Sequence, residues 1–157
     1  MNKVVDQAMN DAVVSGIFPS AQLLVSKGGR SIFHEAYGNA TLKTIFDIAS
    51  LTKPICTTTL IMQLVAEDAL RLDDAVAGHI KEFSDGAKKE ITVRHLLNHS
   101  SGLPAWQPFY QMIPREEIGT KLAKSLIIDT ICREPLKYKI DSQSEYSDMG
   151  FILLGEI

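Results

Sequence analysis

The spacing of Ser50 and Lys53 suits nucleophilic catalysis. The two residues are three positions apart, which in a helix brings a hydroxyl and an amine to the same side. A serine hydroxyl needs a nearby base to become a nucleophile. A lysine amine can be that base if burial and neighbouring groups lower its pKa. The pair therefore predicts covalent catalysis by Ser50.

This spacing is weak evidence by itself, because about one Ser-x-x-Lys match is expected by chance in a chain of this composition. A serine helix cap followed by a surface lysine is the alternative interpretation. Three features favour catalysis: the strand-like apolar run 44–48, the almost wholly apolar run 51–68, and Tyr146 further along the chain. A helix without a polar face is predicted to be buried, and a lysine at its start then needs a partner.

Other chemical motifs are weaker. His95 and His99 are four residues apart, but Leu96 stands where the metalloprotease pattern requires a glutamate. Capping or core histidines are the more common case, so we predict no metal site and no cofactor. The sequence contains no G-x-S-x-G nucleophile elbow and no glycine-rich phosphate loop. These absences disfavour an α/β-hydrolase and a nucleotide-binding protein.

Composition limits the function classes further. The 157 residues are 45% hydrophobic and 22% charged, which is typical of a globular protein. With 16 basic and 19 acidic residues the net charge is −3, which disfavours a nucleic-acid partner. No apolar run approaches the roughly 18 residues of a membrane span. The two cysteines, Cys56 and Cys132, are predicted to be reduced core residues.

Localisation stays open. Residues 1–15 lack a basic segment followed by an apolar stretch, so they do not resemble a secretory signal. The sequence as given therefore favours the cytoplasm. A periplasmic or secreted protein whose signal has been removed would look the same.

The spacing of apolar residues predicts the helices and strands that position these residues. Apolar spacing predicts a helix over 2–15, and two apolar runs around Gly28-Gly29 predict a β-hairpin. Thr92 is the predicted cap of a short helix. The further expectations are turns and helix over 71–83, a solvated charged loop at 84–90, a helix over 115–132, and a last helix from Ser147 to the chain end.

Several stretches together resemble the serine β-lactamase and penicillin-binding-protein superfamily. They are Phe46–Lys53, Leu72–Asp74, Ile91–Pro104 and Tyr146–Phe151, and they occur in the order of that family. The branch that they resemble most contains class C β-lactamases, D-alanyl-D-alanine carboxypeptidases and esterases. Tyr146 lies 96 residues after Ser50, which is the usual separation of the first two catalytic motifs in this family.

The resemblance implies roles for five residues. Ser50 forms the acyl-enzyme, Lys53 assists its deprotonation, and Tyr146 is the general base, with a phenol pKa lowered by the Lys53 cation. Asp148 and Trp106 are the expected substrate-binding residues. The implied function is a serine hydrolase acting on an ester, an amide, or a substrate of the D-amino-acid peptide or β-lactam type.

Two of these assignments carry qualifications. Asp148 stands where penicillin-recognising members have asparagine, and an ionised aspartate only accepts hydrogen bonds. Asp148 should also favour protonated Lys53, and it lowers the expectation of strong β-lactam hydrolysis. Trp106 belongs to an aromatic group that could line the substrate entrance, or could equally form a small satellite core.

The implied fold is α+β, with an antiparallel sheet flanked by helices plus a helical region. We expect 1–157 to form part of one domain, with a helix and strands over 1–48 and a mostly helical region over 49–157. The third family motif, Lys-Thr-Gly or His-x-Gly, does not occur in the sequence. We therefore expect an N-terminal portion that contains only the N-terminal strands.

The expected partner is a small-molecule or peptide substrate. The alternative hypothesis is a catalytically inactive fragment or homologue that acts in folding, self-association or ligand binding. Such a chain could pair with the missing C-terminal half or with another copy of itself.

Overall fold

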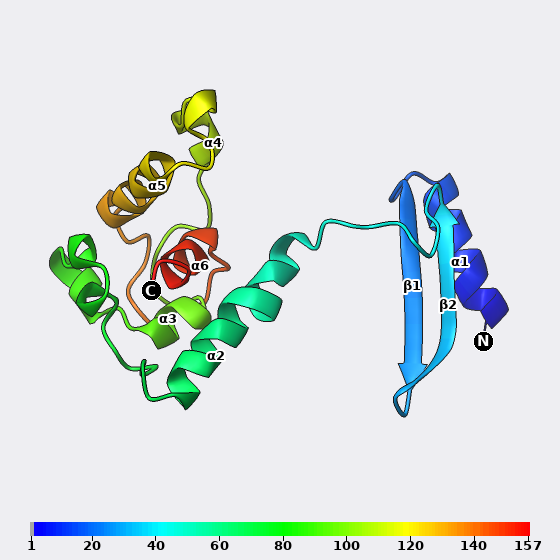
Figure 1. Cartoon of the computed structure of the whole chain (residues 1–157), viewed down its shortest axis with the longest axis horizontal. Coiled ribbons are helices and arrows are strands. Elements are labelled where there is room, and N and C mark those ends of the chain that lie inside the picture. Colours follow the sequence, from blue (N-terminus) through cyan, green and yellow to red (C-terminus); the bar gives the residue numbers. More distant parts are fainter. Residues whose placement is uncertain (1) are drawn as a thin grey trace. The chain divides into compact units, whose positions relative to one another are not determined.

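The computed structural model describes residues 2–157 and divides into two compact units, Met1–Ile48 and Ala49–Ile157. The first unit contains α1 (Asn2–Val14), β1 (Ser20–Lys27) and β2 (Arg30–Gly38). The second contains η1 (Ala49–Leu51), η2 (Lys53–Thr58), α2 (Thr59–Ala66), η3 (Val76–Gly78), η4 (Lys81–Phe83), η5 (Gly86–Glu90), α3 (Val93–Leu97), α4 (Phe109–Met112), η6 (Arg115–Glu117), α5 (Lys121–Arg133) and α6 (Asp148–Leu154) (Figure 1).

The first unit is a helix beside a β-hairpin. The strands pair antiparallel from Ser20 opposite Gly38 to Lys27 opposite Arg30. Gly28 and Gly29 both have positive φ, the conformation that a two-residue hairpin turn requires. The buried Tyr37 donates its hydroxyl to Asp6 of α1 over 3.0 Å, which ties the helix to the sheet. The predicted helix and hairpin are confirmed.

The second unit is built around a single hydrophobic core. Short helices and turns supply its fully buried side chains, among them Phe83, Ile91, Leu96, Ile131 and Leu153. Helix α3 starts as predicted, because the Thr92 hydroxyl accepts a hydrogen bond from the backbone N–H of His95. In return, the backbone N–H of Thr92 donates a hydrogen bond to His95 Nδ1 over 3.0 Å. Helix α6 packs against α3 and η2.

The apolar run 51–68 differs from the single buried helix that was predicted. It begins as a 3-10 turn, continues as the π-helix η2, and becomes α-helical only from Thr59 to Ala66. Pro54 has no N–H to donate, which favours an irregular first turn. Ile61 is buried in the core, but the side chains of Leu51, Ile55, Leu60 and Met62 are exposed. Within the described residues of this unit, only one side of the run is covered.

Three other predicted boundaries were wrong. Residues 44–48 form no strand, since they pair with no neighbouring strand among the described residues. The helix expected over 115–132 starts at Lys121, capped by the Thr120 hydroxyl, and Gly119 at φ +85° separates it from η6. The last helix ends at Leu154 with Gly155 as its C-cap. The short helix α4 was not predicted.

Two polar or reactive residues also differ from expectation. Within the segment 84–90, residues Gly86–Glu90 form the 3-10 helix η5, and every residue of the segment is solvent-exposed as expected except Lys88, which is buried. The Lys88 ammonium donates to the Cys132 carbonyl, one of the backbone acceptors left unsatisfied at the end of α5. Cys132 is buried as predicted, whereas Cys56 is exposed.

Gly102 lets two backbone segments approach closely. Its φ is +86°, and a Cβ at this position would lie 2.5 Å from the Tyr138 carbonyl oxygen. The Gly102 carbonyl accepts a hydrogen bond from the Lys137 N–H over 2.8 Å. The 98–104 stretch is thereby held against the segment that leads to Tyr146.

We expect Gly102→Ala to lower the free energy of unfolding by clearly more than about 1 kcal/mol, because it adds a steric clash to the strain of positive φ. Gly119→Ala is the matched control. Gly119 has the same φ within a degree, but a Cβ there meets nothing within 4 Å. Urea denaturation of both variants checks the difference. Equal destabilisation would show that the contact with Tyr138 is unimportant.

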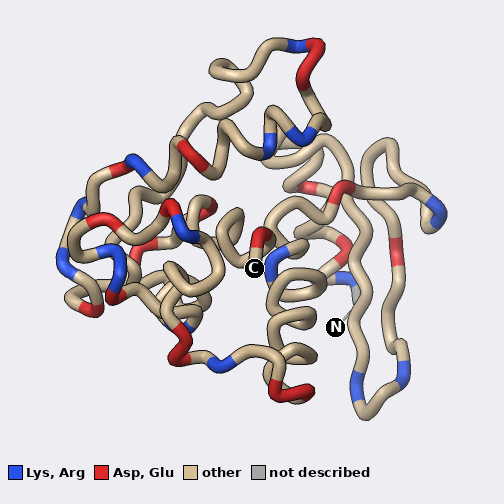
Figure 2. Tube along the Cα trace, turned by 60° about the vertical axis from the view of Figure 1, so that its left-hand side comes forward, with Lys and Arg blue, Asp and Glu red and all other residues tan. Residues whose placement is uncertain are grey.

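Charges of both signs are interspersed along the chain (Figure 2). Within residues 2–157, no helix is both long and apolar enough to cross a membrane.

Candidate active site

Ser50 lies at the centre of η1, three residues before Lys53, the first residue of the π-helix η2. The preceding residue, Ala49, has a φ of +43°, which is uncommon for a residue with a side chain. Such backbone conformations cost of order 1–3 kcal/mol and cluster at functional sites. The turn therefore presents Ser50 at the junction of an irregular segment and a helix.

Lys53 is the centre of the polar cluster. Its Nζ lies 3.3 Å from Ser50 Oγ and 2.6 Å from Asp148 Oδ1. The same ammonium lies 4.8 Å from the ring centroid of Tyr146. The Lys53 side chain is only 15% exposed, so the interactions that it makes replace much of its hydration. The predicted need for a partner is met by Asp148.

Tyr146 and Asp148 are delivered by the start of α6. Ser147 between them caps the helix, accepting from the Gly150 N–H and donating its hydroxyl to the Pro104 carbonyl over 2.8 Å. The Asp148 N–H donates to the Ala105 carbonyl, also over 2.8 Å. The 104–105 backbone thus fixes the start of α6. This is how residues almost a hundred positions apart in sequence meet at Lys53.

His99 is a further residue of the site, which sequence analysis considered only as a possible metal ligand together with His95. Its ring lies 4.8 Å from that of Tyr146 and 5.2 Å from that of Phe151, centroid to centroid. Its Nδ1 accepts a hydrogen bond from the Ser147 N–H over 3.0 Å, which requires an unprotonated Nδ1. Burial, followed by the charge of Lys53, lowers the pKa of His99. A neutral His99 therefore positions Tyr146.

His95 faces a different partner. Its Nε2 lies 3.0 Å from Asp141 Oδ2, whereas His99 contacts the start of α6. The two histidines are therefore engaged in separate structural contacts rather than in a common metal site. Only the spacing in sequence had paired them.

Electrostatics distinguish the two candidate bases. Burial alone would lower the pKa of Lys53, but the hydrogen bonds with Asp148 and Tyr146 outweigh it and raise the pKa above its ordinary value. Lys53 is therefore a cation rather than the free amine that direct proton abstraction needs. Hydrogen bonds with Lys53 and Ser50 lower the pKa of Tyr146. Tyr146 is thus the better base of the two.

Trp106 is not joined to this cluster by a described contact within residues 2–157. Its ring lies 6.5 Å from that of Tyr110, and more than half of its surface is exposed. The structure therefore brings Ser50, Lys53, Tyr146 and Asp148 together and places Trp106 in a neighbouring aromatic pair.

We expect Asp148→Asn to reduce stability at pH 7 by about 1 kcal/mol or less, as is usual for a partly exposed ion pair. The pair raises the pKa of Lys53 in the folded state above the ordinary 10.5. Its contribution is therefore complete below pH 10.5 and disappears as pH rises through the folded-state pKa. Wild type and variant should then converge in urea denaturation above that pH.

Asp73→Asn is the control for this prediction. Asp73 pairs with Arg94 over 2.9 Å, and an arginine keeps its charge throughout this range. The effect of Asp73→Asn should therefore not change between pH 7 and pH 11. A pH-independent effect of Asp148→Asn would contradict the assignment of a raised Lys53 pKa.

Comparison with known proteins identifies the fold. The model of the family described as "Beta-lactamase" matches residues 1–157. The chain is 31% identical to a protein named "Putative D-alanyl-D-alanine carboxypeptidase" from Escherichia coli (strain K12), over 89% of the chain and 37% of that protein. It spans less than half of the relatives that it matches.

Solved structures agree. The "putative beta-lactamase" from Bacteroides dorei DSM 17855 superposes with a TM-score of 0.80 at 24% identity, covering 98% of this chain and 44% of that one. EstCE1, "a hydrolase with promiscuous acyltransferase activity", superposes with a TM-score of 0.73 at 24% identity, covering 99% and 45%. The predicted β-lactamase-like fold is confirmed. The chain belongs to the Beta-lactamase family.

Proposed function

We propose that the protein is a serine hydrolase that works through an acyl-enzyme on Ser50. The observation that supports this most is the single ammonium of Lys53, which lies 3.3 Å from Ser50 Oγ and 4.8 Å from the Tyr146 ring. Nucleophile, cation and lowered-pKa phenol are thereby in contact. An adjacent base and an oriented cation are what a serine needs to attack a carbonyl.

In the proposed reaction Tyr146 accepts the proton of Ser50 as its oxygen attacks the substrate carbonyl. The bond to the leaving group breaks, and Tyr146 returns the proton to that group. Water then repeats the sequence on the acyl-enzyme, releasing the acid and restoring the Ser50 hydroxyl. Lys53 remains protonated throughout and favours the phenolate form of Tyr146.

Asp148 and Trp106 are the proposed substrate-binding residues. Asp148 can accept a hydrogen bond from a substrate N–H, but it cannot donate one to a carbonyl when ionised. This favours simple esters or amides over β-lactams. The carboxypeptidase name of one relative and the acyltransferase activity of EstCE1 support the same broad class, in which an acyl group is transferred from an ester or amide.

Parallel assays test the substrate class. The chain is mixed in turn with p-nitrophenyl acetate, nitrocefin and a D-alanyl-D-alanine peptide, and product release is followed for each. The proposal predicts ester turnover that exceeds nitrocefin turnover. Nitrocefin as the best substrate would reverse the ranking. Absence of turnover with all three would favour a non-catalytic role.

A further inference from the structure

An apolar pocket lies beside the candidate active site within the Ala49–Ile157 unit. Its volume is about 590 Å³, within the usual range of small-molecule sites. The walls come from 109–128 and from α6, and include Phe109, Tyr110, Ile118, Ile127, Phe151 and Ile152. The composition suits an apolar ligand group rather than a charged one.

Phe151 connects this pocket to the polar cluster. Its side chain lines the pocket, and its ring centroid lies 5.8 Å from Lys53 Nζ. The Lys53 Nζ in turn lies 3.3 Å from Ser50 Oγ. Helix α6 therefore contributes to both sites. Asp148 in its first turn contacts Lys53, and Phe151 and Ile152, one turn further along, line the pocket. Phe151 thus belongs both to the pocket wall and to the surroundings of Lys53.

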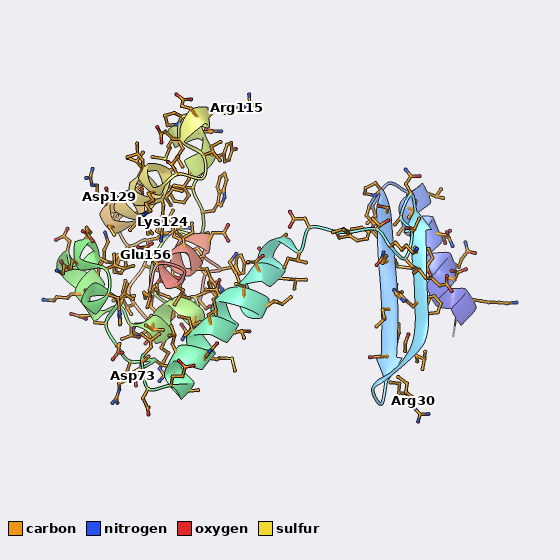
Figure 3. All side chains as sticks on the ribbon, in the orientation of Figure 1. Arg30, Asp73, Arg115, Lys124, Asp129 and Glu156 are labelled. Atoms are coloured by element: carbon orange, nitrogen blue, oxygen red, sulfur yellow. The ribbon has the colours of Figure 1, made fainter. Side chains whose placement is uncertain are left out.

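Two lysines, Lys121 and Lys124, also line the pocket, and an ion pair neutralises Lys124. Lys124 on α5 lies 2.6 Å from the Glu156 carboxylate that follows α6, and the two side chains lie next to each other in Figure 3. This pair joins the two elements that form the walls. Apart from Thr120 and Lys121, the remaining lining residues are aromatic, aliphatic or glycine, and they are the main contacts for a ligand.

We propose that this pocket holds an apolar acyl chain while it is esterified to Ser50. The proposal rests on the proposed hydrolase function. The acyl group stays on Ser50 between the two half-reactions, whereas the leaving group departs, so the acyl group is the one that requires a lasting site. The preferred substrates are then esters or amides of medium-chain apolar acids.

A series of ester substrates with acyl groups of increasing length tests whether the pocket holds the acyl group. The assays use the 157-residue protein. We expect kcat/KM for p-nitrophenyl esters to rise from acetate to decanoate, by up to about fourfold for each methylene that enters the pocket. Alkyl acetates of increasing alcohol length should show no such rise. Ile118→Trp places a larger side chain at the pocket wall and should lower the decanoate-to-acetate ratio at least tenfold.

Ile17→Trp is the matched control, since Ile17 and Ile118 are both exposed isoleucines, 74% and 64%, and only Ile118 lines the pocket. A flat acyl series, a rise in the alcohol series, or an unchanged ratio in Ile118→Trp would overturn the proposal.

Binding gives a readout that does not require turnover. Calorimetric titration of decanoate into Ser50→Ala should show binding that Ile118→Trp in the same background weakens at least tenfold. Undetectable decanoate binding would overturn the pocket assignment while leaving the hydrolase open. Acetate ester turnover that survives Ser50→Ala would instead contradict the hydrolase mechanism.

Discussion

Ser50→Ala is expected to lower kcat/KM for p-nitrophenyl acetate by at least about 10⁴-fold. Removal of a nucleophile abolishes the covalent route and leaves only the small rate enhancement due to binding and polarisation. Ser50 Oγ is the hydroxyl in contact with Lys53 Nζ, over 3.3 Å. Alanine cannot replace serine in the covalent route, because its side chain has no atom that can form an ester.

The control is Ser125→Ala, on the exposed surface of α5. It should retain the wild-type rate, and both variants should keep the wild-type circular dichroism spectrum. The comparison separates loss of the nucleophile from loss of fold. A Ser50→Ala variant that retains more than a tenth of the activity would rule out the acyl-enzyme at this residue.

The second large effect is expected for Lys53→Met. Loss of the cation should reduce kcat/KM by about 10²–10⁴-fold, the usual contribution of assisted proton transfer. Hydrogen bonds with Lys53 and with Ser50 hold the pKa of Tyr146 below its ordinary 10.0. Without Lys53 that pKa moves back toward 10, so the rising limb of the pH–rate profile should shift to higher pH.

The pH profile is the decisive readout, because a merely structural lysine would lower the rate without moving the limb. Lys53→Arg provides the comparison: the charge remains, while the guanidinium differs from the ammonium in shape and donor geometry. The rising limb of the Lys53→Arg pH–rate profile should stay near its wild-type pH, although the rate falls. A Lys53→Met profile with an unshifted limb would mean that Tyr146 is not the titrating base.

Local chemistry explains which parts of the fold could be predicted. The hairpin was evident because Gly28-Gly29 suits a tight turn between two apolar runs. Helix α3 was evident because Thr92 is a good N-cap residue, and the last helix was expected from Ser147; both residues cap their helices in the structure. Each of these signals lies within a few residues of the element that it specifies.

The features that sequence reasoning missed depend on distant partners. Lys88 can be buried because its ammonium donates a hydrogen bond to the Cys132 carbonyl. His99 is held in position by the ring of Tyr146 and by the backbone N–H of Ser147. The order of motifs indicated that Ser50, Lys53, Tyr146 and Asp148 belong together. The expectation that Asp148 favours protonated Lys53 followed from the place of Asp148 in the motif. The structure adds the 2.6 Å contact between Lys53 Nζ and Asp148 Oδ1 and shows that the pKa of Lys53 is raised in spite of its burial.

The role of Ser50 as the nucleophile is tested best by the mass of a covalent adduct. The chain is incubated with a fluorophosphonate probe, digested, and mapped by mass spectrometry, with Ser50→Ala treated in parallel. Ser50 should be the one modified residue, and Ser50→Ala should not be labelled. Labelling elsewhere, or equal labelling of both proteins, would contradict the assignment of Ser50 as the nucleophile.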